Sequence, residues 1–162
     1  MIEMKVSGVI LDSSSRHPIV MLRDMEERRA LLIWIGEPEA NAILMALEGI
    51  RAPRPLTHDL AILLLDKVDA RLKRVSITDM REQTFFAELE LEVNGKTITL
   101  DARPSDAIAL ALRAEAPILV SPDVVTANAV PINPAKEEEE AEEFRQFLQN
   151  VKPGDFGKFS KD

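Results

Sequence analysis

Seven short stretches of the chain carry the hydrophobic pattern of β-strands. In some of them apolar and polar residues alternate, as on a strand with one buried face, and residues 85–93 are the clearest case. Residues 30–35 are all apolar, which predicts a strand buried on both faces. Asn94-Gly95 predicts a two-residue hairpin turn. The predicted strands are 2–11, 18–22, 30–35, 74–78, 85–93, 97–102 and 117–121.

Apolar residues spaced three or four apart predict three helices. Two of them begin at prolines, Pro38 and Pro104, because a first helical turn does not need the missing N–H. Another follows Thr57, an expected N-cap, and is apolar around most of its circumference, so we expect it to be largely buried. The predicted helices are 38–49, 57–70 and 104–115, with a further helical turn over 123–127.

The order strand-strand-strand-proline-helix occurs twice along the chain. Gly36–Glu39 and Ala102–Ser105 hold equivalent positions in the two copies. This order predicts an α+β domain with mixed or antiparallel sheets, built from a degenerate duplicated unit of three strands and a helix. The alternative is chance recurrence of a common motif.

A change of composition at Pro131–Pro134 predicts a boundary between an α+β domain, residues 1–134, and an acidic C-terminal helix and tail, residues 135–162. The tail helix either docks on its own domain or is swapped to, or bound by, a partner, since an apolar stripe needs a surface to cover it. Its predicted apolar face consists of Phe144, Phe147, Leu148 and Val151.

The formal net charge of −8 excludes a protein that coats nucleic acid by bulk electrostatics, although a local basic strip is compatible with it. Six phenylalanines and one tryptophan leave little for a base-stacking platform. The chain has no cysteine, no signal-peptide pattern at its start and no apolar run long enough to span a bilayer. We therefore expect a cytoplasmic protein without a membrane partner.

Four polar residues are gathered where a predicted strand turns into the helix at Pro104, namely Asp101, Arg103, Ser105 and Asp106. One interpretation is a capped helix in which Arg103 and Asp106 form a local ion pair. The other is a site where carboxylates, a cation and helix N–H groups converge on a metal or a phosphate. Spacing alone favours the capped helix, because caps are far commoner than sites.

His58 stands beside Asp59 at a predicted helix start, just after a loop that contains Arg51 and Arg54. A histidine can act as a general acid or base near neutral pH, and arginines can hold a phosphodiester. The alternative is that Thr57 and Asp59 cap the helix while His58 makes a structural hydrogen bond, and chemistry alone favours this alternative.

Several carboxylates are suited to a hard metal ion. Mg²⁺ takes one or two carboxylates together with waters and substrate phosphates, so two converging side chains are enough. The candidates are Glu37, Glu39, Asp59, Asp101 and Asp106.

Two motifs, Arg54–Leu60 (RPLTHDL) and Asp101–Ala107 (DARPSDA), resemble the bifunctional nuclease domain family. Three further stretches carry the resemblance, which extends over about residues 3–156: Leu32–Gly36 with Glu39-Ala40, Phe85–Ala87, and Phe144–Leu148 with Pro153–Phe156. The resemblance implies a compact α+β fold and, for some members, cleavage of both DNA and RNA. The family positions that look chemical correspond to Glu37, His58, Asp59, Asp101, Arg103, Ser105 and Asp106.

The resulting hypothesis is a nuclease of low sequence specificity that hydrolyses DNA and RNA with the help of Mg²⁺ or Mn²⁺. The expected catalytic residues are His58, Asp59, Asp101 and Asp106. The expected phosphate-binding residues are Arg51, Arg54, Arg103 and Ser105. The expected metal ligands are Glu37, Asp101 and Asp106.

The alternative hypothesis is a non-catalytic, oligomeric interaction or regulatory module. The acidic balance, the scarcity of stacking aromatics and the apolar stripe of the predicted tail helix favour it. A homo-oligomer, which we expect to be a dimer, is compatible with both hypotheses, whereas nucleic acid is an expected partner only under the first.

Overall fold

The computed structural model describes residues 1–133, 135, 139, 142 and 146. It divides into two compact units, Met1–Pro131 and Ile132–Asp162, and the fold below is that of the first unit. The predicted apolar face of the tail helix, from Phe144 to Val151, lies outside the described residues. The predicted domain boundary at residues 134 and 135 stays a prediction.

The first unit has the α+β composition that the sequence predicts. Its strands join in one mixed sheet of eight, in the order β6-β5-β4-β7-β1-β2-β3-β8. The elements in chain order are β1 (Ile2–Leu11), β2 (Pro18–Asp24), β3 (Arg29–Trp34), α1 (Glu37–Leu47), α2 (Thr57–Lys67), β4 (Ala70–Arg81), β5 (Thr84–Val93), β6 (Lys96–Ala102), α3 (Pro104–Ala114), β7 (Ile118–Val120), α4 (Pro122–Asn128) and β8 (Val130–Pro131).

The sheet consists of two antiparallel three-stranded halves, each followed by a helix. β1, β2 and β3 form one half and β4, β5 and β6 form the other. β7 lies between the halves, antiparallel to β1 and parallel to β4. The predicted hairpin at Asn94-Gly95 is confirmed, since both residues have positive φ (51° and 74°), as a type I′ turn requires.

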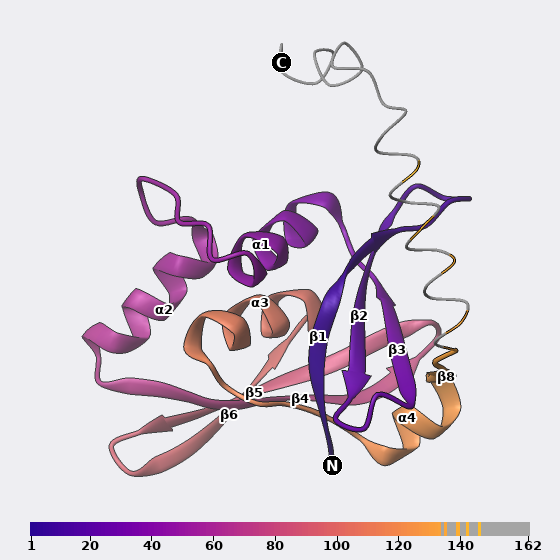
Figure 1. Ribbon diagram of the computed structural model, residues 1–162. Coiled ribbons are helices and arrows are strands. Elements are labelled where there is room, and N and C mark those ends of the chain that lie inside the picture. The colour runs from indigo at the N-terminus through magenta and orange to yellow at the C-terminus, as the bar shows by residue number, and fades with distance from the viewer. Residues whose placement is uncertain (134, 136–138, 140–141, 143–145, 147–162) are drawn as a thin grey trace. The chain divides into compact units, whose positions relative to one another are not determined.

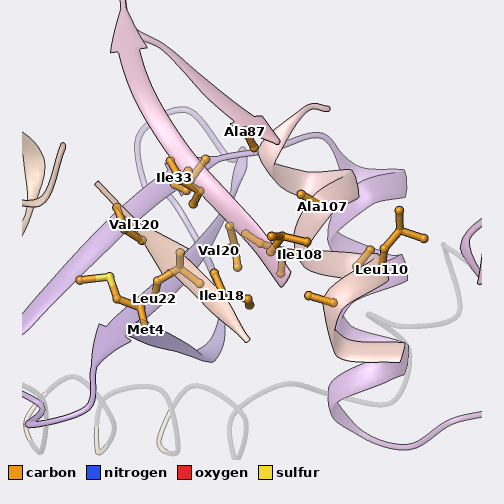
Figure 2. Packing of buried hydrophobic residues seen from close by; sticks show 14 of the residues in the cluster. Met4, Val20, Leu22, Ile33, Ala87, Ala107, Ile108, Leu110, Ile118 and Val120 are labelled. Atoms are coloured by element: carbon orange, nitrogen blue, oxygen red, sulfur yellow. The ribbon is translucent and has the colours of Figure 1, made fainter. Parts of the chain in front are cut away.

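Helix α3 packs its alanine-rich sequence into the core of the unit. Ala107, Ile108 and Ala109 are completely buried, because alanine lets the helix approach the sheet closely. Figure 2 shows Ile108 among side chains of the sheet that include Val20 and Ile118. In Figure 1, α1, α2 and α3 lie together on one side of β4–β6. The three helices therefore hold one another in place above the sheet.

Helix α2 differs from the sequence expectation, because none of its residues is buried. Its inner side, with Ile62 and Leu65, packs against the core, but its outer side is covered by nothing in the described part of the chain. Its exposed apolar side chains are Leu60, Leu63 and Leu64, followed by Val68 just beyond the helix. Although α2 is this apolar, none of the described helices is long and apolar enough to cross a membrane.

Two further expectations about local structure are corrected. Leu56, not Thr57, is the N-cap of α2, because Thr57 is itself the first helical residue and the Asp59 carboxylate accepts the Leu56 N–H at 3.0 Å. Strand β3 is buried on both faces at its start, where Ala30 and Leu31 are buried, but not at its end, where Trp34 is 54% exposed. The indole stays at the surface because its N–H bonds to Asp12 in the turn after β1.

Candidate active site

The first turns of α1, α2 and α3 meet at one place on the unit. Arg103, the residue before α3, reaches Glu39 in the first turn of α1, with 3.3 Å between Nη1 and Oε1. His58, in the first turn of α2, reaches Asp106 in the first turn of α3, with 2.9 Å between Nε2 and Oδ1. Helix N-termini carry partial positive charge and free N–H groups, so their convergence favours an anion.

Asp106 is the centre of this arrangement. Its Oδ1 faces His58, and its Oδ2 accepts from Nε and Nη2 of Arg103 at 2.9 and 2.8 Å. Burial raises the pKa of Asp106, but hydrogen bonds from His58 and Arg103 outweigh it and leave the pKa below its ordinary value. An ionised Asp106 only accepts, so Nε2 of His58 carries the proton in this hydrogen bond, and in the neutral form of the imidazole Nδ1 is the acceptor.

Arg103 is a cation shared by two carboxylates. Asp106 raises the pKa of the guanidinium further, with a smaller effect from Glu39. Its side chain remains 66% exposed, so it also faces solvent and any bound anion. A Cβ at Gly36, the N-cap of α1, would overlap the Glu39 carboxylate, so a larger residue there would require the Glu39 side chain to shift.

Two hollows adjoin the ion pair between Arg103 and Glu39, and both residues line both of them. The larger, here called the cleft, has a volume of about 760 Å³ and is lined also by Pro38, Asn41, Ala42, Pro55, Leu56, Thr57, His58, Ala61, Asp106 and Leu110. The smaller, here called the groove, has a volume of about 400 Å³ and is lined also by Ile33, Trp34, Ile35, Gly36, Gln83, Thr84, Phe85, Pro104 and Ser105. The polar cluster is therefore open to a ligand from two sides.

Asp59 does not line the cleft. Its carboxylate accepts from Nε of Arg113 at 2.7 Å, and this hydrogen bond is the main reason that its pKa is lowered. Arg113 also donates to the backbone oxygens of Ala109 and Ala42. The buried guanidinium of Arg113 thus ties α1, α2 and α3 together behind the site, and Asp59 belongs to this support.

The expected metal ligands are not brought together. Asp101 on β6 pairs with Glu88, whereas Ala102 pairs with the buried Ala87, so Asp101 lies on the sheet face opposite α3. Glu37 is exposed and lines neither hollow, and both oxygens of Asp106 already accept hydrogen bonds. Among the described residues, no three histidine or carboxylate side chains are placed to hold a metal ion.

Two of the four expected phosphate-binding residues lie at the site, and the other two do not. Arg103 is in the centre of the site, and Ser105 is buried in the wall of the groove. Arg51 and Arg54 are exposed in the loop between α1 and α2 and line neither hollow. The structure thus joins His58, Arg103 and Asp106, with Ser105 beside them.

The roles of Glu39 and Arg113 were missed in the sequence. Sequence reasoning identifies Glu39 only as one of several candidate metal ligands and does not identify Arg113. A signal for Glu39 exists, because Glu39, Asp59 and Asp106 are each the third residue of their helix. No local pattern points to Arg113, whose partners on the other two helices, Asp59 and Ala42, are 54 and 71 residues away.

Comparison with known proteins identifies the family. The model of the bifunctional nuclease domain matches residues 20–133, which include the three helix starts and both hollows. The chain belongs to the bifunctional nuclease domain family. An uncharacterized protein of Mycobacterium tuberculosis is 40% identical to it over 163 residues, which cover 95% of this chain and 97% of that protein.

Plant proteins that share the bifunctional nuclease domain are longer. Bifunctional nuclease 1 of Oryza sativa subsp. indica is 31% identical over 124 residues, covering 75% of this chain and 38% of the plant protein. Bifunctional nuclease 1 of Arabidopsis thaliana is 31% identical over 119 residues, covering 70% and 36%. The chain therefore spans little more than a third of these plant relatives.

Proposed function

We propose that the chain is a nuclease that hydrolyses phosphodiester bonds of DNA and RNA with low sequence specificity, and that the cleft is its active site. The observation that carries this proposal is the hydrogen bond between His58 and Asp106, with Arg103 on the same carboxylate. A histidine oriented by a carboxylate, beside a guanidinium, has the parts of a general base next to a phosphate-binding group. Membership of the bifunctional nuclease domain family supports the choice of phosphodiester chemistry.

In the proposed reaction, Nδ1 of His58 accepts a proton from water as the water oxygen attacks phosphorus. The bond to the leaving nucleotide oxygen breaks, and that oxygen takes a proton from solvent. Asp106 holds the imidazole by Nε2 and stabilises the imidazolium that forms. Arg103 and the helix N-termini stabilise the negative charge that grows on the phosphoryl oxygens.

Assistance by Mg²⁺ or Mn²⁺ stays a prediction from the sequence. Glu37, Asp101 and Asp106 lie apart or are already engaged, so these residues do not fit a preformed metal site, and no step above depends on one. Whether cleavage requires a metal is therefore measured separately from whether it requires His58, Arg103 and Asp106.

Paired substitutions of two aspartates test the proposed site. We expect Asp106→Asn to lower cleavage of labelled single-stranded RNA and duplex DNA about 10- to 100-fold, because Asn stabilises neither the imidazolium nor the Arg103 guanidinium. Asp101→Asn is the matched control and should cleave at the wild-type rate, since its side chain lies on the other face of the sheet. Each protein is assayed with Mg²⁺, with Mn²⁺ and with EDTA.

Equal loss in both variants, or loss only in Asp101→Asn, would contradict the proposed site. Equal cleavage by all three proteins would point to a contaminating nuclease. Cleavage that EDTA abolishes in the wild type would establish metal assistance, and cleavage that persists in EDTA would exclude it.

The exposed face of α2 favours a second function, that of an interaction module that binds a second copy of itself. Leu60, Leu63, Leu64 and Val68 are 43–65% exposed. β6 is an edge strand with Ile98 and Leu100 also exposed, and a free strand edge pairs most simply with the same edge of an identical chain. We propose that these apolar residues form a contact between two copies.

Light scattering tests the contact. We expect the wild-type chain to have the mass of a dimer and Leu60→Glu/Leu64→Glu to have the mass of a monomer, because charges oppose apolar burial. Lys67→Glu adds negative charge to the same helix without removing an apolar side chain and is the matched control. A monomeric wild type, or a dimer in all three proteins, would remove this second candidate.

A further inference from the structure

Trp34 is exposed at the surface but fixed in orientation. It ends β3, and 54% of it is accessible to solvent. Its Nε1 donates to Oδ2 of Asp12 at 3.0 Å, while Asp12 also accepts from Ser14 and Ser15 in the same turn. The hydrogen bond engages the edge of the indole and therefore restricts the orientation of the ring.

Trp34 and Arg103 line the same groove of about 400 Å³. Phe85 from β5 also lines this groove. Arg103 is in addition the cation of the proposed active site. The groove thus offers an aromatic surface and the cleft offers a proton acceptor, with one guanidinium between them. A nucleotide has the complementary parts, a flat base joined to a phosphate.

We propose that Trp34 is a stacking platform for an unpaired base of single-stranded DNA or RNA, whose adjoining phosphate lies at Arg103. This inference rests on the proposed nuclease function and adds the form of the substrate to it. In a duplex, both faces of each base are covered by its neighbours, so only an unpaired base can lie on the indole. The platform therefore favours single strands over duplexes.

The charges around Trp34 fit a base better than a phosphate. The indole N–H is hydrogen-bonded to the Asp12 carboxylate, which would repel a phosphate placed beside it. Arg103, which also lines the groove, attracts one. The proposed nucleotide therefore has a single orientation, with its base toward β3 and its phosphate toward the first turn of α3.

Trp34 is the only tryptophan in the chain, and there is no tyrosine, so tryptophan emission reports on this site alone. We expect oligodeoxythymidylate, added in EDTA, to quench the emission and to protect the ring from acrylamide. An abasic oligonucleotide of the same length carries the phosphates without the bases and should do neither. A duplex of the same length should quench only weakly. Quenching by the abasic strand equal to that by oligodeoxythymidylate would overturn the proposal.

Substitution of Trp34 gives a second readout. We expect Trp34→Leu to weaken binding of labelled oligodeoxythymidylate about tenfold, measured by anisotropy, and Trp34→Phe to restore part of the loss. Both variants should bind the abasic strand as the wild type does, and circular dichroism checks that each is folded. Equal affinity of the Leu variant and the wild type for oligodeoxythymidylate would overturn the stacking role.

The outcomes separate this inference from the nuclease function. Cleavage that favours single strands in the wild type and loses that preference in Trp34→Leu supports both. Cleavage with the same strand preference in both proteins supports the proposed nuclease function and contradicts the stacking role of Trp34. Binding that depends on Trp34 without any cleavage supports the stacking role of Trp34 and contradicts the proposed nuclease function.

Discussion

A His58→Gln variant is expected to cleave single-stranded RNA and DNA about 100-fold more slowly than the wild type, or more slowly still. General base catalysis contributes about 10²- to 10⁴-fold to enzymatic rates. The glutamine amide can still donate to Asp106 in place of Nε2, but it has no group that accepts a proton at neutral pH. The loss should therefore appear in kcat, with little change in substrate affinity.

The chain provides its own control for this experiment. His17 is the only other histidine, and it is exposed in the turn between β1 and β2. His17→Gln should leave kcat unchanged, and both variants should unfold at the wild-type temperature. Wild-type cleavage by His58→Gln would remove His58 from the mechanism and with it the argument for the cleft.

The largest effect on stability is expected from Arg113→Met, at about 2 kcal/mol of unfolding free energy. The Arg113 side chain is 10% exposed, and its loss removes bonds to Asp59 and to two backbone oxygens that join three helices. Asp59 is 37% exposed, so solvent screening keeps the cost below that of a fully buried pair. Urea unfolding measures the change.

An exposed arginine is the matched control. Arg71→Met on β4 should change the unfolding free energy by less than about 0.5 kcal/mol. The difference in unfolding free energy between Arg113→Met and the wild type should also depend on pH. Since Arg113 lowers the pKa of Asp59, this stabilisation is complete above the ordinary value of 3.8 and is lost as pH falls through the lowered value. If the difference in unfolding free energy stayed the same at acid pH, the stabilisation by Arg113 would not come from its ion pair with Asp59.

The repeated order of strands and helices could be predicted because each element has a local cause. Alternation marks β5, proline begins α3, and Asn94-Gly95 fixes the hairpin. The exposure of the outer side of α2 could not be predicted, because an apolar sequence shows which side chains a helix could bury but not whether a neighbouring element covers them. The exposure of Trp34 depends in the same way on a turn 22 residues earlier.

The site was predicted to the extent that helix starts could be located. Arg103 is the N-cap of α3 and Asp106 lies three residues later in its first turn, so their ion pair follows from sequence spacing. His58 reaches Asp106 across 48 residues, and only the packing of α2 on α3 brings them together. Asp101 is separated from the site by strand alternation, which places neighbours in sequence on opposite faces.

The position of β7 has a consequence for how the chain is made. β7 joins the two halves of the sheet, yet Ile118–Val120 follows both of them in sequence. On the ribosome, β1, β2 and β3 can pair as soon as they emerge, but the free edge of β1 stays open until nearly ninety more residues have been synthesised. An open strand edge is a template for association with other chains. The nascent chain is therefore most exposed to aggregation in the interval before its shortest internal strand arrives.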